Sequence, residues 1–210
     1  MPEAEIDQVR FLVLHTLKIN GIVGSDSIAE KTGIPLDEIE PVLSSRMEQS
    51  QVRKREGRVS GFTLLPDGTS AHASLLDLAM SSREDKEALS KAYTEFLSIN
   101  SRFKHICTEW QLRGPDEIND HTDPEYDAKV LSLLSAVHSD ACEILGQLSS
   151  IQGRYSNYHT RLENAYSRVQ SGDISAFVKP MSNSYHDIWM ELHQDLLTSL
   201  KLERTDEDGA

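Results

Sequence analysis

The chain has 210 residues, of which 38% are hydrophobic and 26% are charged, which is the composition of a globular protein rather than a fibrous or disordered one. Its net charge of −13 excludes a general binder of polyanions. No run of about eighteen apolar residues is present, and the start lacks the basic-then-apolar order of a secretory signal, so we expect a cytoplasmic protein without a membrane segment.

The first fifty residues read as three helices. Apolar residues recur at helical spacing over residues 6–19. A short second helix is expected over residues 25–33, with Ser27 and Glu30 spaced as a capping box. A third helix follows over residues 36–49. Two short helices joined by a tight, glycine-containing turn are typical of a helix-turn-helix.

A basic β-hairpin is predicted directly after these helices. Residues 52–55 and 59–64 read as strands around a Glu56-Gly57 turn, and a further helix is expected over residues 69–80. Four cations lie on this ribbon: Arg53, Lys54, Arg55 and Arg58. Because side chains alternate along a strand, at most two or three of them can face one partner. Phosphate contact is one interpretation, and protection of an exposed sheet edge is the other.

The hairpin and the segment after it resemble the MarR-like winged-helix regulators, whose wing commonly runs into a Leu-Thr-x-x-Gly segment. Leu64, Pro66 and Gly68 fit this pattern, whereas Leu65 stands where threonine is usual. The resemblance covers about residues 6–80. It implies a winged helix whose third helix enters the major groove of DNA while the hairpin lies on the phosphates.

The predicted third helix has an unusual outward face for a helix that reads DNA. With Ile39, Leu43 and Met47 turned inward, the outward residues are Asp37, Glu38, Pro41, Ser44, Ser45 and Glu48. Three carboxylates repel phosphates, and a reading helix normally presents Arg, Lys, Asn or Gln. The predicted DNA-binding residues are therefore Ser44, Ser45, Arg46, Gln49, Arg53, Lys54, Arg55 and Arg58.

Everything after residue 83 reads as helical. Helices are expected over residues 84–99, 101–112, 157–170 and 182–200, together with a long helix that starts at Asp123-Pro124. Apolar positions 126, 130, 134, 137, 141, 144 and 148 of the long helix form a packing or coiled-coil seam. We therefore expect a mostly α protein with three parts: a winged helix-turn-helix domain (1–80), a bundle-like helical dimerisation and effector domain (81–202) and a disordered acidic tail (203–210).

As a whole the chain resembles winged-helix proteins of actinobacteria that carry a helical second domain. The segments that carry this likeness are GRVSGFTLLPDG (57–68), TEWQLR (108–113), NDHTDPEYDA (119–128) and SYHDIWMELHQDLL (184–197).

The last helix places two histidines on or beside its apolar face. They are interpreted either as packed histidines of the core or its rim, or as part of a pocket for a small effector, or as metal ligands. The candidate pocket residues are His105, Trp110, His138, His186, Trp189 and His193. Since two helical turns separate His186 from His193 by about 10 Å, this pair alone cannot hold one ion, and we predict no metal or other cofactor. Cys107 and Cys142 are expected to be reduced thiols in the core.

The sequence thus favours a homodimeric transcriptional regulator that binds double-stranded DNA and responds to a small effector. The alternative is a winged-helix module that binds another protein and no DNA. An enzyme is not expected, because the chain has no Gly-rich phosphate loop, nucleophile elbow or HExxH motif. Asp123 is interpreted as a helix cap, and residues 119–122 as a loop.

Overall fold

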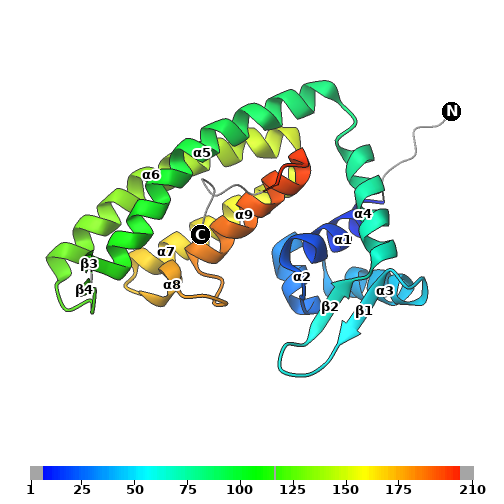
Figure 1. Ribbon diagram of the computed structural model, residues 1–210, viewed down its shortest axis with the longest axis horizontal. Coiled ribbons are helices and arrows are strands. Elements are labelled where there is room, and N and C mark those ends of the chain that lie inside the picture. Colours follow the sequence, from blue (N-terminus) through cyan, green and yellow to red (C-terminus); the bar gives the residue numbers. More distant parts are fainter. Residues whose placement is uncertain (1–6, 116, 204–210) are drawn as a thin grey trace. The chain divides into compact units, whose positions relative to one another are not determined.

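The computed structural model describes residues 7–115 and 117–203, which are mostly helical and include two small antiparallel hairpins (Figure 1). They divide into two compact units. The first unit comprises the chain up to Lys86 together with His193–Glu203, and the second comprises Glu87–Leu192. Within the described residues, no helix combines the length and the apolar character that crossing a bilayer requires.

The first unit has the predicted order of elements. Its helices and strands are α1 (Gln8–Asn20), α2 (Ser25–Thr32), α3 (Leu36–Glu48), β1 (Val52–Arg55), β2 (Gly61–Leu64) and α4 (Pro66–Ala79). The two strands pair in antiparallel register from Val52 opposite Leu64 to Arg55 opposite Gly61. Gly57 in the connecting turn has a φ of 123°, as the predicted turn requires.

One cap and two boundaries in this unit differ from the prediction. The expected capping box is wrong, because α2 already begins at Ser25 and its N-cap Gly24 has no side chain to offer, so Ser27 lies inside the helix. Helix α4 begins earlier than expected, with Pro66 in its first turn, where a missing N–H does no harm. Strand β2 begins at Gly61 rather than at residue 59.

Two glycines allow the hairpin to pack closely on its neighbours. Phe62 exchanges two backbone hydrogen bonds with Val23, of 2.7 and 3.0 Å, which tie β2 to the connection between α1 and α2. A Cβ on Gly61 would lie 2.7 Å from the Val23 carbonyl. A Cβ on Gly68, in α4, would lie 2.0 Å from the carbonyl oxygen of Gln51. Both positions therefore exclude any side chain.

The C-terminal residues complete the first unit through a buried polar chain. The Nε2 atom of His15 lies 3.0 Å from Asp195 Oδ1, and its Nδ1 lies 2.9 Å from His72 Nε2. Ser199 Oγ donates to Asp195 Oδ1 at 2.9 Å. All four residues are buried. The first unit is therefore built from both ends of the sequence, whereas a contiguous segment of residues 1–80 was expected.

The second unit is built from long helices. Its elements are α5 (Arg83–Gln111, whose first turn belongs to the first unit), β3 (Leu112–Gly114), β4 (Glu117–Ile118), α6 (Pro124–Ile151), the 3₁₀ turn η1 (Gly153–Tyr155), α7 (Ser156–Gln170), α8 (Ser175–Val178) and α9 (Tyr185–Leu200, up to Leu192). The β3–β4 hairpin and α8 are not among the predicted elements. Of the predicted acidic tail, residues 204–210 lie outside the described residues.

Helix α5 is continuous where two helices were expected. The expected break falls at Asn100, which is buried and whose Oδ1 accepts a hydrogen bond of 2.8 Å from Trp189 Nε1. A polar residue in the apolar stripe therefore marks a buried hydrogen bond, not a helix end.

The apolar seam of α6 packs against other helices of the second unit. Six of its seven positions are buried: Val130, Leu134, Val137, Ala141, Ile144 and Leu148. The seventh, Tyr126, is half-buried, and its hydroxyl donates to the carbonyl oxygen of Glu109 at 2.9 Å. Because the seam already packs within one chain, it offers no exposed stripe to a second copy.

Candidate nucleic-acid interface

The four cations of the β1–β2 hairpin are exposed and unneutralised. In the part of the chain that the structure describes, no ion pair or side-chain hydrogen bond involves Arg53, Lys54, Arg55 or Arg58. Strand alternation places Lys54 on the same face as Val52, and Arg53 and Arg55 on the opposite face. The hairpin therefore presents positive charge on both of its faces.

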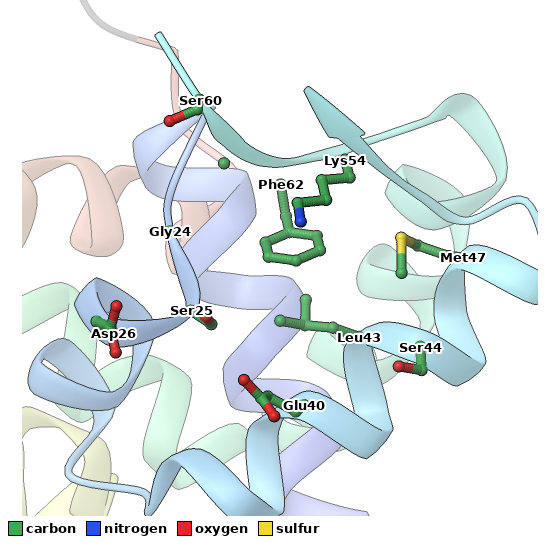
Figure 2. Close-up of a pocket in the computed structure, with 11 residues that line it drawn as sticks. Gly24, Ser25, Asp26, Glu40, Leu43, Ser44, Met47, Lys54, Ser60 and Phe62 are labelled. Carbon is green, nitrogen blue, oxygen red and sulfur yellow. The ribbon is translucent and has the colours of Figure 1, made fainter. Parts of the chain in front are cut away.

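A groove of about 410 Å³ lies between α2, α3 and the hairpin (Figure 2). The residues that line it are Gly24, Ser25, Asp26, Glu40, Leu43, Ser44, Met47, Lys54, Ser60, Gly61 and Phe62. The charged residues of this lining are two acids, Asp26 and Glu40, and one base, Lys54. The groove is therefore acidic, and phosphate groups are disfavoured inside it.

Three of the predicted base-reading residues on or beside α3 are hydrogen-bonded to each other. Arg46 donates to Ser45 Oγ and to Gln49 Oε1, both at 2.9 Å, and Gln49 Nε2 donates to Ser45 Oγ at 3.3 Å. Arg46 also reaches Gln51 Oε1 at 3.4 Å. Burial, helped by the neighbouring charge of Arg10, lowers the pKa of Arg46 from its usual value. The Arg46 side chain is therefore partly buried, and its hydrogen bonds hold the side chains of Ser45, Gln49 and Gln51 in place.

The structure thus distributes the eight predicted DNA-binding residues over four places. Ser44 and Lys54 share the groove. Ser45, Arg46 and Gln49 form the cluster just described, while Arg53 and Arg55 lie on the outer face of β1 and Arg58 lies in the turn.

For two of the groove residues, the position in the structure differs from the one that the sequence pattern predicted. Met47 was expected to be inward, but it is half-exposed and lines the groove. Glu40 was not assigned to the outward face, although it precedes Ser44 by four residues and therefore shares its face. That spacing was the available signal.

The six predicted effector-pocket residues lie in different surroundings within the described chain. Trp110 and Trp189 are buried in the core of the second unit, and His193 belongs to the first unit. His105 is 71% exposed and lies 3.5 Å from Glu109 of its own helix. A helical wheel gives the direction of a side chain but not what packs over it, so it could not distinguish these environments.

One of the six, His186, does line a cavity of about 250 Å³ in the second unit. Its other lining residues come mainly from α5, with one each from α8, the segment after α8 and α9: Asn100, Phe103, Lys104, Cys107, Thr108, Gln111, Val178, Pro180 and Met190. Burial lowers the pKa of His186, and the nearby Asp187 partly opposes this shift.

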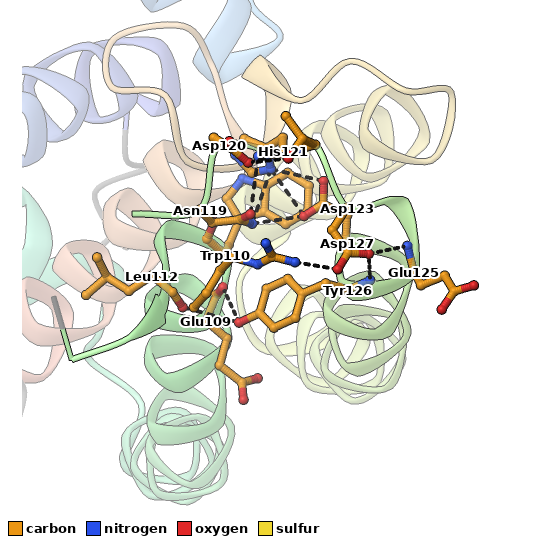
Figure 3. A network of polar contacts seen from close by, with 12 residues as sticks. Glu109, Trp110, Leu112, Asn119, Asp120, His121, Asp123, Glu125, Tyr126 and Asp127 are labelled. Carbon is orange, nitrogen blue, oxygen red and sulfur yellow. Dashed lines mark hydrogen bonds and ion pairs between the residues drawn. The ribbon is translucent and has the colours of Figure 1, made fainter. Parts of the chain in front are cut away.

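The loop before α6 is held by a polar network (Figure 3). Asp123 caps α6, as predicted, by accepting from the backbone N–H groups of Glu125 and Tyr126 at 3.1 and 3.0 Å. The buried Asn119 donates to the Trp110 carbonyl at 3.1 Å and to Asp127 at 2.9 Å. His121 lies 3.1 Å from the same Asp127 carboxylate. These contacts order the loop, and they account for its polar residues.

Both cysteines are free thiols, but neither is fully buried as the sequence pattern predicted. Burial raises the pKa of each thiol to about 12. Cys107 lines the cavity next to His186. The surroundings of Cys142 are polar: its thiol lies 3.7 Å from His138 Nε2 and donates to Glu163 Oε1 at 3.4 Å.

No protein family model matches this chain, and no curated protein or solved structure matches it.

Proposed function

We propose that the first unit is a winged helix-turn-helix of the MarR-like kind and that the protein is a DNA-binding transcriptional regulator. One observation carries the proposal: the hairpin after α3 bears four exposed cations that no acidic group of the described chain neutralises. Three helices followed by a basic two-stranded ribbon are the arrangement in which a helix enters the major groove and a wing contacts phosphates.

The charges suggest which face contacts the DNA backbone. Asp26 and Glu40 make the groove side of the hairpin unfavourable for phosphates. Phosphate contact therefore falls to Arg53 and Arg55 on the outer face and to Arg58 in the turn. Helix α3 enters the major groove with Ser44 and the cluster around Arg46.

Charge neutralisation tests this proposal. The variant with Arg53, Lys54, Arg55 and Arg58 all replaced by Gln should lose retention on duplex DNA at low salt. A matched control replaces four exposed cations of the second unit by Gln: Lys91, Arg102, Lys129 and Arg168. Both variants become more negative by four charges. If only the net charge of the protein mattered, the two variants would therefore lose the same amount of DNA binding. Equal DNA binding by the hairpin variant and the parent would refute the assignment.

The acidic groove favours a second candidate, a protein-interaction module without DNA binding. Its carboxylates, of Asp26 and Glu40, surround apolar atoms of Leu43, Met47 and Phe62, a combination that suits a basic segment of a partner protein. This candidate predicts no retention on DNA at any ionic strength. It also predicts a partner whose binding is lost in the Asp26→Asn, Glu40→Gln double variant.

We further propose that the regulator is a cytoplasmic homodimer. A single small DNA-binding domain contacts few base pairs, and a dimer gains affinity for DNA by binding two half-sites at once. The α6 seam is not the dimer contact, because its residues pack within one chain. Sedimentation equilibrium of the full chain measures the oligomeric state.

The cavity beside His186 is the proposed effector site. The test is whether a bound ligand protects Cys107, which lines this cavity, from alkylation.

A further inference from the structure

Four side chains of the kinds that bind transition metals gather between α6 and α7. His138 and Cys142 stand four residues apart on α6, and His159 and Glu163 stand four residues apart on α7. This spacing puts both members of each pair on one face of their helix. Helices α6 and α7 pack against each other (Figure 1). Donors from both helices, His138 and Cys142 of α6 and Glu163 of α7, therefore come together at one point.

The distances within the cluster suit a tetrahedral ion. The ligand atoms of His138, Cys142 and Glu163 all lie within 4.8 Å of one another. Glu163 Oε1 is 3.4 Å from His138 Nε2 and 3.4 Å from Cys142 Sγ, and the latter two atoms are 3.7 Å apart. Zinc bonds of about 2.0–2.3 Å place tetrahedral ligands about 3.3–3.8 Å from each other. An ion can therefore enter with little movement of the three donors.

The buried ligand, His138, is held in a fixed orientation. Its Nε2 atom faces the cluster, while its Nδ1 lies 3.2 Å from the hydroxyl of Tyr185. The ring also stacks on Tyr166, with 3.9 Å between centroids. When Nδ1–H donates to Tyr185, Nε2 keeps its lone pair toward the cluster. A second contact that fixes the tautomer in this way is typical of histidines that bind metals.

The other side of the cluster is open to solvent and carries a fourth candidate donor, His159. The side chains of Glu163 and His159 are 48% and 40% exposed, and His159 Nε2 lies 3.7 Å from Glu163 Oε1. The imidazole of His159 lies outside the group of three, and its exposed side chain would have to turn toward them to bind the same ion. Two imidazoles, one thiolate and one carboxylate form a mixed nitrogen, sulfur and oxygen set, which suits Zn²⁺ rather than Ca²⁺ or Mg²⁺.

We propose that His138, Cys142, His159 and Glu163 bind one Zn²⁺ ion that cross-links α6 to α7. The site is independent of the DNA-binding proposal, because all four residues belong to the second unit. Its four protein ligands resemble the closed sets of structural zinc sites, so the expected effect of the ion is stabilisation of this helix pair.

Metal titration of the full chain, freed of metal by chelation, tests the site. Co²⁺, which reports on coordination by its colour, should bind in one equivalent, with the visible bands of a tetrahedral ion and a thiolate-to-cobalt charge-transfer band in the near ultraviolet. Zn²⁺ should displace the Co²⁺ and raise the melting temperature. Failure of Co²⁺ and Zn²⁺ to bind at stoichiometric concentration would overturn the proposal.

The two cysteines and two of the three His-x-x-x-Glu pairs of the chain provide matched controls. Cys142→Ser should abolish the charge-transfer band, whereas Cys107→Ser should keep it. Glu163→Gln should weaken Zn²⁺ binding by at least about tenfold. The double variant His105→Gln, Glu109→Gln removes a pair of the same types and spacing on α5, the histidine exposed and the glutamate half-buried, and should bind as the parent does. A band that survives in Cys142→Ser, or that is lost in Cys107→Ser, would place the metal elsewhere and refute the site.

Discussion

Arg161 of α7 and Glu191 of α9 form a buried, bidentate ion pair. Both terminal guanidinium nitrogens of Arg161 donate to the carboxylate at 2.9 Å, one to each oxygen. The two side chains are only 10% and 7% exposed. The pair fixes the position of α9 residues against α7 in the second unit.

Removal of one partner of this pair should destabilise the second unit strongly. The variant Arg161→Met leaves the carboxylate of Glu191 buried without its cation, which typically costs about 3–5 kcal/mol in the free energy of unfolding. Urea unfolding followed by circular dichroism measures the change. Arg168→Met is the control, because the Arg168–Asp173 pair is exposed and should contribute no more than about 1 kcal/mol. Equal effects of the two variants would contradict this account.

Gly68 should be irreplaceable by alanine although it lies in a helix. The added Cβ would overlap the carbonyl oxygen of Gln51 at 2.0 Å, and a backbone shift of this kind costs typically about 1–3 kcal/mol. At Gly146 of α6, by contrast, an added Cβ would meet no neighbouring atom within 4 Å, so Gly146→Ala should stabilise by up to about 1 kcal/mol. Thermal unfolding of both variants tests this prediction: the melting temperature should fall in Gly68→Ala and rise in Gly146→Ala. A stabilised Gly68→Ala would show that the hairpin and α4 pack differently.

The stability of the second unit should fall as the pH drops through about 6.5, in part because of His186. Burial lowers the pKa of this side chain below its usual value of 6.5. The unfolded chain therefore takes up a proton at a higher pH than the folded chain, and acidification favours unfolding. His186→Asn should flatten this dependence, as measured by urea unfolding between about pH 5 and pH 8.

Local sequence signals predicted much of the fold. The apolar spacing of α1 and α3, the Glu56-Gly57 turn and the Asp123 cap each depend on residues a few positions apart, and the structure confirms these elements. The return of Asp195 to His15 in the first unit depends on contacts 180 residues apart, for which the sequence offers no pattern. Asn100 was misinterpreted for the same reason, since its partner Trp189 is distant in the chain.

The candidate sites could be predicted only in part. The hairpin cations were visible because β-strands expose alternate residues, but the cluster of Arg46, Ser45 and Gln49 was not, because side-chain hydrogen bonds follow no periodicity. The histidine and cysteine of α6 show metal-binding spacing by themselves. What the sequence could not show is that α7 places Glu163 opposite them.

The most direct test of the central proposal is the salt dependence of DNA binding. For the parent chain, the logarithm of the association constant with duplex DNA should fall linearly with the logarithm of salt concentration, with a slope of about −0.9 for each phosphate contacted. Neutralising Arg53, Lys54, Arg55 and Arg58 together should make this slope shallower by about 2–3, because two or three of these cations face the backbone. The control variant of the second unit should keep the parental slope. An unchanged slope in the hairpin variant, or no binding by the parent at low salt, would contradict the account.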